Sequence, residues 1–340
     1  MVDHPPQPAI WQSAEAGGLV FFTTVLRLAR RFQLKRNESS LRREKMHLIV
    51  NPAANRGRSG RIIGKLSLML QERGVLPEWH ITNAPGEARS AAGSVPEDEI
   101  VVAVGGDGTV HEVSSACIGT ERVMGILPTG SGNDYVKALG FGRSLRESVE
   151  VLVSGRVRSV DAGEVNGVTF NNGLGIGFDA EVAEGVAAAP AYFGATGRYL
   201  WSIGRLLVGF ECHPARLTFG EPDGDQTTVE AETILVAAAL GTTYGARFRL
   251  APHAKLDDGL FDVVWSREIN RLDVLRILPS ALGDGLHRHA EISLKRTSCL
   301  TVELAEPVPA HVDGEMLAPT RRFEVKILPS TLKVIAPARP

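Results

Sequence analysis

The fold is decided by Ile100-Val101-Val102-Ala103-Val104-Gly105-Gly106-Asp107-Gly108-Thr109-Val110-His111-Glu112, in which an apolar run leads directly into a glycine-rich turn. The run shows no alternation of polar and apolar residues, which is typical of a parallel strand covered on both faces. Three glycines in four positions let the backbone approach an anion closely, and a helix over residues 110–118 would direct its free N–H groups at that anion. The stretch therefore predicts a phosphate site.

Asp107 is the unusual member of this turn, because a carboxylate repels a phosphate unless a cation or a proton donor lies between them. Nucleotide phosphates with a divalent metal such as Mg²⁺ would satisfy the arrangement. The alternative is an ordinary strand-to-helix turn in which glycine and aspartate only meet the demands of the backbone. A glycine turn by itself does not decide between the two.

The length and composition indicate an ordinary globular protein. The 340 residues suit two domains, and 44% hydrophobic with 22% charged residues can form a sizeable core. A net charge of −2 gives no reason to expect nucleic acid as a partner. The cysteines Cys117, Cys212 and Cys299 are too far apart for a CxxC motif and argue against a disulfide framework, so a reducing cytoplasm fits best.

The first 45 residues differ from the rest. Residues 27–45 carry eight Lys or Arg and two Glu, a net charge of +6, and follow a short apolar stretch. Such a segment can lie on an anionic membrane surface; the alternatives are a solvated tail or a true start at Met46. No apolar run reaches the length of about 20 residues that a spanning helix needs, and the arginines follow the apolar stretch, so no export is expected.

Residues 46–128 alternate short apolar strands with helical patterns. Strands are expected over residues 46–50, 79–82, 100–104 and 124–127, with helices at 62–70, 87–92 and 110–118. This order predicts a parallel sheet with right-handed crossovers, which binds ligands at the carboxyl ends of its strands. The first strand leads there into Asn51-Pro52-Ala53-Ala54-Asn55, and the fourth into Pro128-Thr129-Gly130-Ser131-Gly132-Asn133-Asp134.

The turn after the fourth strand has two glycines that flank a hydroxyl. In the functional interpretation, Ser131 contacts a phosphate oxygen and Asp134 lies beside Asp107 near the metal. In the alternative, the turn is a helix entry that Ser131 or Asn133 caps.

The second half is predicted to be mostly antiparallel β structure. After a linker, Asn166-Gly167 between β-type runs is a strong hairpin signal. Further strands are expected over residues 215–219, 233–240, 260–265, 300–304 and 322–328, with helices near 198–210 and 270–277. Asp313-Gly314-Glu315 then places two carboxylates around a glycine at the end of a β-run, which by itself can be a polar turn.

Two of these motifs together resemble a known family. The GGDGT motif at residues 105–109 is similar to one shared by diacylglycerol kinases, sphingosine and ceramide kinases, NAD kinases and, with Ser for Thr, phosphofructokinases. With P-x-G-[ST]-x-N-D at residues 128–134, the chain resembles the catalytic domain of diacylglycerol and sphingosine kinases and of bacterial lipid kinases similar to them. NAD kinases and phosphofructokinases lack the second motif. Residues 170–180 and 251–263 resemble further motifs of this family, so the resemblance spans residues 46 to about 335.

The resemblance implies an α/β nucleotide domain, similar to that of phosphofructokinases and NAD kinases, over residues 46–161, joined by the C-terminal segment 325–340. It implies a lipid-binding antiparallel β-sandwich over residues 162–324, with the active site in the cleft between the domains. Residues 1–45 would be a flexible basic extension.

The implied activity is an ATP- and Mg²⁺-dependent transfer of the γ-phosphoryl group to a hydroxyl of a membrane lipid. Diacylglycerol, a related glycerolipid and a sphingoid base are the candidate acceptors. The enzyme would be cytoplasmic and transiently at the inner membrane surface, in peripheral contact with anionic lipid, and a homodimer is left open. The alternatives are an NAD-kinase-like phosphotransferase acting on a soluble substrate and a non-catalytic regulator that binds lipid or nucleotide.

The resemblance also implies roles for individual residues. In the D-G-E segment, Glu315 would be the catalytic base and Asp313 its support, through the loop or through the metal network. The other implied catalytic carboxylates are Asp107, Asp134 and Asp161. The implied nucleotide-binding residues are Asn51, Pro52, Ala53, Ala54, Asn55, Thr82, Gly106, Asp107, Gly108, Thr109, Val110, His111, Glu112 and Ser131. The implied ligands of a structural Mg²⁺ are the carbonyl oxygens of Lys255 and Leu260 and the carboxylate of Asp258, with an Asx turn free of metal as the alternative.

The sequence departs from the family pattern at three places. Ser131 replaces the commoner Thr and keeps the hydroxyl. Asn55-Arg56-Gly57 displaces the glycine that is usual soon after Asn-Pro, which bears on the first phosphate contact. Residues 241–245 replace a GGG segment, which bears on the shape of the lipid-facing cleft.

Overall fold

The computed structural model describes residues 45–142, 144–207, 211–221, 224–244, 248–283 and 285–338. The basic segment predicted to contact the membrane therefore lies outside the described residues, apart from Lys45. In the part of the chain that is described, the helices are all too short or too polar to cross a bilayer.

A parallel sheet forms the first half of the molecule, with the spatial order β4-β3-β1-β2. The strands β1, β3 and β4 are largely apolar because helices cover both faces, whereas β2 carries Glu78 and His80. One face packs against α2 and α6, and the other packs against α3 and α4. The bounds are β1 Met46–Val50, α2 Ala54–Gln71, β2 Glu78–Ile81, α3 Glu87–Ser94, β3 Ile100–Gly105, α4 Asp107–Cys117, β4 Val123–Pro128, α5 Asp134–Ala138 and α6 Leu145–Ser154.

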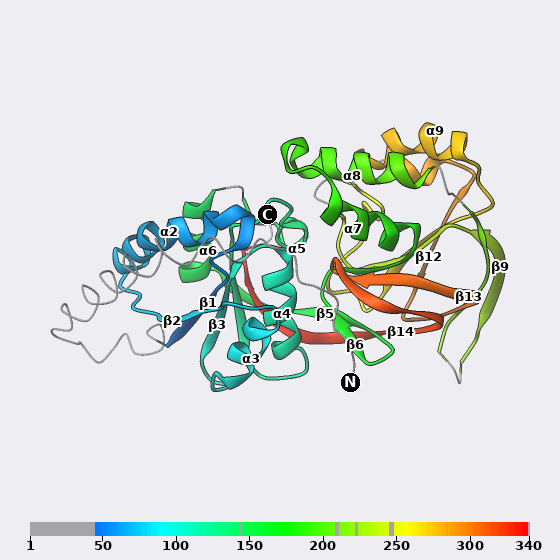
Figure 1. The fold of residues 1–340 in the computed structure, drawn as a ribbon. Coiled ribbons are helices and arrows are strands. Elements are labelled where there is room, and N and C mark those ends of the chain that lie inside the picture. Colours follow the sequence, from blue (N-terminus) through cyan, green and yellow to red (C-terminus); the bar gives the residue numbers. More distant parts are fainter. Residues whose placement is uncertain are drawn as a thin grey trace, which may run out of the picture.

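Antiparallel strands form the second half, in which β7, β10, β11 and β12 are paired in that order and β13 also pairs with β8. Three helices, α7, α8 and α9, are grouped on one side of these strands (Figure 1). The strand bounds are β5 Arg156–Val165, β6 Val168–Phe170, β7 Gly173–Gly177, β8 His213–Phe219, β9 Thr227–Thr233, β10 Leu235–Ala239, β11 Phe261–Ser266, β12 Ile292–Thr297, β13 Cys299–Val312 and β14 Glu315–Ala336. The helix bounds are α7 Phe178–Ala188, η3 Ala191–Phe193, α8 Gly194–Leu206, α9 Arg271–Ala281 and η4 Leu286–Arg288.

The long strand β14 connects the two halves (Figure 1). Its first part pairs with β13, whereas its last part lies antiparallel to β5 and parallel to β4. The end of β14 therefore returns to the parallel sheet and extends it beyond β4. The predicted fold class, a parallel α/β half with an antiparallel β-sandwich half, is confirmed.

The structure differs from three local expectations. The segment expected to be a linker contains α6, which a capping box between Ser144 and Glu147 begins. The second half has a third helix, α7, which begins where Gly177 turns the chain at φ +80°. The strand expected over residues 233–240 is interrupted at Ile234, because the Thr233 hydroxyl accepts the Leu235 N–H and ends the regular pairing.

Candidate active site

The two glycine turns lie side by side because β3 and β4 are neighbours and end together, with Gly105 opposite Pro128. The turns pack backbone against backbone: a Cβ atom on Gly130 would lie 2.5 Å from the Cα of Gly106. The Thr129 N–H donates to the Gly105 carbonyl at 2.8 Å. Glycine is therefore required where the two turns meet, which is a condition for presenting free N–H groups to an anion.

The carboxylate of Asp107 joins the first turn to the second. It accepts the N–H groups of Asn133 and Asp134, each at 2.7 Å, where α5 begins. A Cβ atom on Gly132 would lie 2.5 Å from Asp107 Oδ2 and 3.7 Å from Asp134 Oδ2, so the two carboxylates converge on this glycine. Lys137 Nζ lies 2.8 Å from Asp134 Oδ1.

The pairing of these carboxylates affects their protonation. Desolvation, followed by the negative charge of Asp134, raises the pKa of Asp107 to about 6, against the opposing effect of the two backbone N–H groups. Two carboxylates this close to one another suit a hard divalent cation, because such a cation removes their repulsion. Asp107 and Asp134 therefore fit the Mg²⁺ that the sequence motif predicts.

The loop after β1 lies at the same edge of the parallel sheet as the two glycine turns. Asn51 Oδ1 accepts the Ala53 N–H at 3.0 Å, and Pro52, Ala53 and Ala54 form the turn that begins α2. Asn55 adopts a left-handed conformation with φ +51° and donates from Nδ2 to the Thr129 carbonyl at 2.9 Å. Asparagine tolerates this conformation better than other residues with a side chain, which explains how it stands near a position usual for glycine.

Some residues predicted to bind nucleotide have side chains that face elsewhere. Val110 is buried in the core, and the buried Thr109 lies beneath Gly105, where it would clash with a Cβ atom. Glu112 accepts the Ala88 and Arg89 N–H groups at 3.0 and 3.3 Å, at the start of α3. The Thr82 hydroxyl donates to the Val50 carbonyl at 3.2 Å. In contrast, Ser131 is exposed on the second turn.

The predicted D-G-E segment is a two-residue hairpin between β13 and β14. Asp313 and Gly314 have φ values of +53° and +93°, as a type I′ turn requires. The Asp313 carboxylate accepts the N–H groups of the three residues from Asn171 to Gly173, each at 2.9 Å, and is contacted by His111 Nδ1 at 2.8 Å. Four donors occupy the accepting positions of one carboxylate, so Asp313 holds the hairpin in place.

His111 carries this contact from α4 to the second half of the molecule. Burial by itself would lower its pKa, but the hydrogen bond to Asp313 and the charges of Asp313 and Glu315 outweigh that effect and raise the pKa. The side chains of His111 and Asp313 are only 12% and 3% exposed. The pair therefore forms a largely buried link between the first glycine turn and the hairpin.

Glu315 is arranged differently from Asp313. Its side chain is exposed, and its Oε1 lies 3.1 Å from the position that a Cβ atom on Gly108 would take. Among the described residues, its carboxylate has no hydrogen-bond partner. Glu315 therefore faces the first glycine turn across the junction of the two halves, with its lone pairs available.

Asp161 and the predicted metal segment lie together. The buried Asp161 carboxylate accepts the N–H groups of Gly259 and Ser330, both at 2.8 Å. Asp258 contacts Arg296 through Oδ2 and accepts the Leu260 N–H at 3.3 Å through Oδ1. The hydrogen bonds of Asp161 hold the segment around Lys255 and Leu260 against the end of β14 and do not reach the glycine turns.

Sequence reasoning missed an apolar cavity of about 120 Å³ beneath α7, α8 and α9. Asp179 is the only acidic residue among the described residues that line it, and its Oδ2 accepts a hydrogen bond from His311 Nε2 at 3.1 Å. His311 Nδ1 in turn accepts the Gly314 N–H at 3.1 Å. The cavity is therefore connected to the D-G-E hairpin through two hydrogen bonds.

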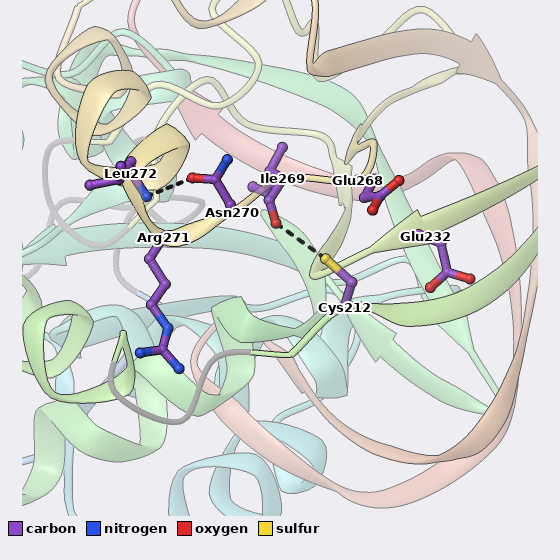
Figure 2. A pocket seen from close by; sticks show the side chains of 7 residues that line it. All are labelled: Cys212, Glu232, Glu268, Ile269, Asn270, Arg271 and Leu272. Atoms are coloured by element: carbon purple, nitrogen blue, oxygen red, sulfur yellow. Dashed lines mark hydrogen bonds between the residues drawn. The ribbon is translucent and has the colours of Figure 1, made fainter.

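A larger and more open pocket of about 780 Å³ lies between Cys212, which directly precedes β8, and the start of α9 (Figure 2). None of the residues predicted from the sequence to form the site lines it. Its lining residues are Cys212, Glu232, Glu268, Ile269, Asn270, Arg271 and Leu272.

Comparison with known proteins agrees with this arrangement. Residues 45–165 match the diacylglycerol kinase catalytic domain, and residues 173–336 match the YegS C-terminal NAD kinase β-sandwich-like domain. A probable YegS-like lipid kinase of Pseudomonas aeruginosa is 32% identical over 244 residues, which cover 70% of this chain and 76% of the relative. A diacylglycerol kinase of Bacillus subtilis is 27% identical over 278 residues, covering 80% and 90%.

A solved structure of a diacylglycerol kinase from Bacillus anthracis has the same fold, with a TM-score of 0.64, 23% identity and coverage of 86% of this chain and 97% of that one. The fold, the glycine turns and these relatives together define the class as lipid kinases. The chain belongs to the family that combines a diacylglycerol kinase catalytic domain with a YegS-type C-terminal domain.

Proposed function

We propose that this protein transfers the γ-phosphoryl group of ATP to a hydroxyl of a membrane lipid such as diacylglycerol. The observation that carries the proposal is the connection between an apolar cavity and the carboxylate hairpin that faces the glycine turns. A soluble acceptor such as NAD has no use for a cavity lined almost entirely by apolar side chains, whereas an acyl chain does.

The nucleotide is proposed to bind over the glycine turns, where free N–H groups and the start of α4 favour phosphates. Asp107 and Asp134 would hold Mg²⁺, which when bound neutralises charge on the transferred phosphoryl group. Ser131 and Asn51 lie on the same edge of the sheet and would contact the nucleotide.

The acceptor is proposed to bind from the opposite side. The cavity of about 120 Å³ beneath α7, α8 and α9 has room for a few methylene groups, so part of one acyl chain would enter it. The acceptor hydroxyl would lie near Asp179 and Glu315. Glu315 takes the hydroxyl proton, the hydroxyl oxygen forms a bond to the γ-phosphorus, and the bond from that phosphorus to the β-phosphate oxygen breaks to release ADP. Asp313 and His111 hold Glu315 at the correct distance, so positioning supplies much of the rate.

The helices that cover the cavity also suggest how the protein reaches its substrate. Leu272 and Leu275 on α9 are 75% and 54% exposed, and Tyr192 and Leu200 beside and on α8 are 81% and 42% exposed. Figure 1 shows α8 and α9 along the same side of the molecule. We propose that this side contacts the bilayer, so that a lipid can pass from the membrane into the cavity.

Incubation with labelled ATP and a total lipid extract, followed by identification of the labelled product, tests the function. The proposal expects a phosphorylated lipid that forms only with Mg²⁺ present. Label appearing in NAD, when NAD is added in equal amount, and in no lipid would overturn it in favour of the NAD-kinase-like alternative. Binding of nucleotide with no labelled product from either acceptor would support the regulator instead.

A further inference from the structure

A second cluster of chemically active side chains lies at the other end of the parallel sheet from the glycine turns. His47 is near the start of β1, and the parallel register places it opposite Glu78 of β2, with His80 two residues further on. Because side chains alternate along a strand, these three residues project from the same face. None of them belongs to the proposed kinase site.

The ligand atoms of these residues are spaced as a metal ion requires. His47 Nδ1 lies 3.0 Å from His80 Nε2 and 3.5 Å from Glu78 Oε2, and the three atoms all lie within 4.8 Å of one another. A tetrahedral zinc ion with bonds of about 2.1 Å has its ligands about 3.4 Å apart. Small side-chain movements would therefore bring the three atoms to coordinating distance.

A fourth residue gives independent support. The other ring nitrogen of His47, Nε2, contacts the carboxylate of Glu99, which Lys45 also contacts at 2.6 Å. Since a carboxylate accepts, Nε2 carries the hydrogen and Nδ1 directs its lone pair toward His80 and Glu78. A carboxylate behind a histidine is the usual outer arrangement of a metal site, because it fixes the tautomer and the orientation of the ring.

We propose that His47, Glu78 and His80 bind a zinc ion, with Glu99 as the carboxylate behind His47. Two imidazoles and one carboxylate suit zinc better than Mg²⁺ or Ca²⁺, which prefer oxygen ligands alone. The Glu78 side chain is 75% exposed, which leaves the fourth position open to water. Since β2 is the last strand of the parallel sheet among the described residues, the ion would join that strand to β1 and stabilise the sheet without taking part in phosphoryl transfer.

Calorimetric titration of the metal-free full-length protein with Zn²⁺ tests the site, with the absorption spectrum of the Co²⁺-loaded protein as a second measurement. The proposal expects one zinc per chain, a tetrahedral cobalt spectrum and a rise in the thermal unfolding midpoint on zinc addition. His80→Ala should abolish all three, and Glu99→Gln should weaken zinc binding by about 10- to 100-fold.

The controls separate loss of the site from loss of the fold. Glu78→Gln changes an exposed ligand and should weaken zinc binding while the metal-free protein unfolds at the wild-type temperature. His213→Ala removes a histidine of β8 outside the cluster and should bind zinc as the wild type does. Absence of zinc binding by the wild type, or equal binding by His80→Ala and the wild type, would overturn the proposal. Kinase turnover does not enter this test, so its outcome is independent of the proposed function.

Discussion

His111 and Asp313 are 202 positions apart in the sequence, and their side chains meet at 2.8 Å. His111 belongs to the helix that follows the first glycine turn, and Asp313 belongs to the hairpin that carries Glu315. The contact fixes the distance between the part of the site proposed to bind nucleotide and the part proposed to activate the lipid hydroxyl. The two carboxylates of the hairpin differ: Asp313 accepts four hydrogen bonds, whereas Glu315 has no hydrogen-bond partner in the part of the chain that the structure describes.

Glu315→Gln is expected to lower kcat by about 10² to 10⁴, because the amide cannot accept the hydroxyl proton. The apparent KM for ATP should change little, and the unfolding temperature should stay at the wild-type value because the side chain is exposed. Steady-state kinetics measure the effect. Glu306→Gln is the control, because Glu306 is an exposed glutamate of β13. Near-normal kcat in Glu315→Gln would remove it as the base.

Asp313→Asn is expected to lower stability as well as kcat. An amide oxygen can accept some of the four hydrogen bonds, but the NH₂ group then faces a donor, and an unsatisfied buried group costs about 1–3 kcal/mol. Urea unfolding measured beside the kinetics tests this. Wild-type stability together with a changed Mg²⁺ dependence would instead place Asp313 in the metal network.

The stability of the metal-free protein should depend on pH through Asp107. Its folded pKa of about 6 lies above the ordinary value of 3.8, so the folded state holds the proton longer than the unfolded state does. The contribution of Asp107 to the free energy of unfolding is therefore complete below about pH 4 and is lost as pH rises through 6. The loss amounts to roughly 3 kcal/mol.

Urea unfolding of the wild type and of Asp107→Asn across this pH range compares the free energies of unfolding of the two proteins. The difference in stability between the two proteins should change between pH 4 and 6 and be constant above that window. Mg²⁺ added at pH 7 should raise the unfolding midpoint of the wild type more than that of the variant. A pH-independent difference would mean that Asp107 ionises normally.

Exposed leucines of α9 are expected to anchor the protein on membranes. The double variant Leu272→Glu and Leu275→Glu should sediment less with lipid vesicles while phosphorylating a dispersed short-chain lipid at the wild-type rate. Leu68→Glu, a leucine of α2 that is 62% exposed, is the matched control and should bind vesicles normally. Equal loss in both variants would attribute the effect to charge alone.

The glycine turns could be predicted because they are encoded locally: an apolar run followed by glycines gives both a strand and its turn. Asp313-Gly314 has the pattern of a two-residue hairpin as well, although only a turn at the end of a β-run was expected there. Ser144 and Glu147 also have the spacing of a capping box, so α6 was visible in the sequence and was missed.

The rest depends on tertiary packing that a single sequence does not reveal. The catalytic role of Asp161 was implied only by the family resemblance, and only the fold shows that its carboxylate accepts hydrogen bonds from Gly259 and Ser330. The described lining of the cavity comes from α7, α8 and α9, from β10, β11 and β12, and from segments between them, none of which signals the cavity alone. His47 and His80 meet only because β1 and β2 pair in one register.

We propose that an apolar cavity delivers a lipid hydroxyl to Glu315. The direct test compares two acceptors, a water-soluble short-chain diacylglycerol and glycerol, by their values of kcat/KM. Both acceptors offer the same primary hydroxyl, and neither requires a membrane. Burial of about four methylene groups at roughly 0.8 kcal/mol each predicts a preference for the diacylglycerol on the order of 10²-fold. Equal kcat/KM values for the two acceptors would contradict the account.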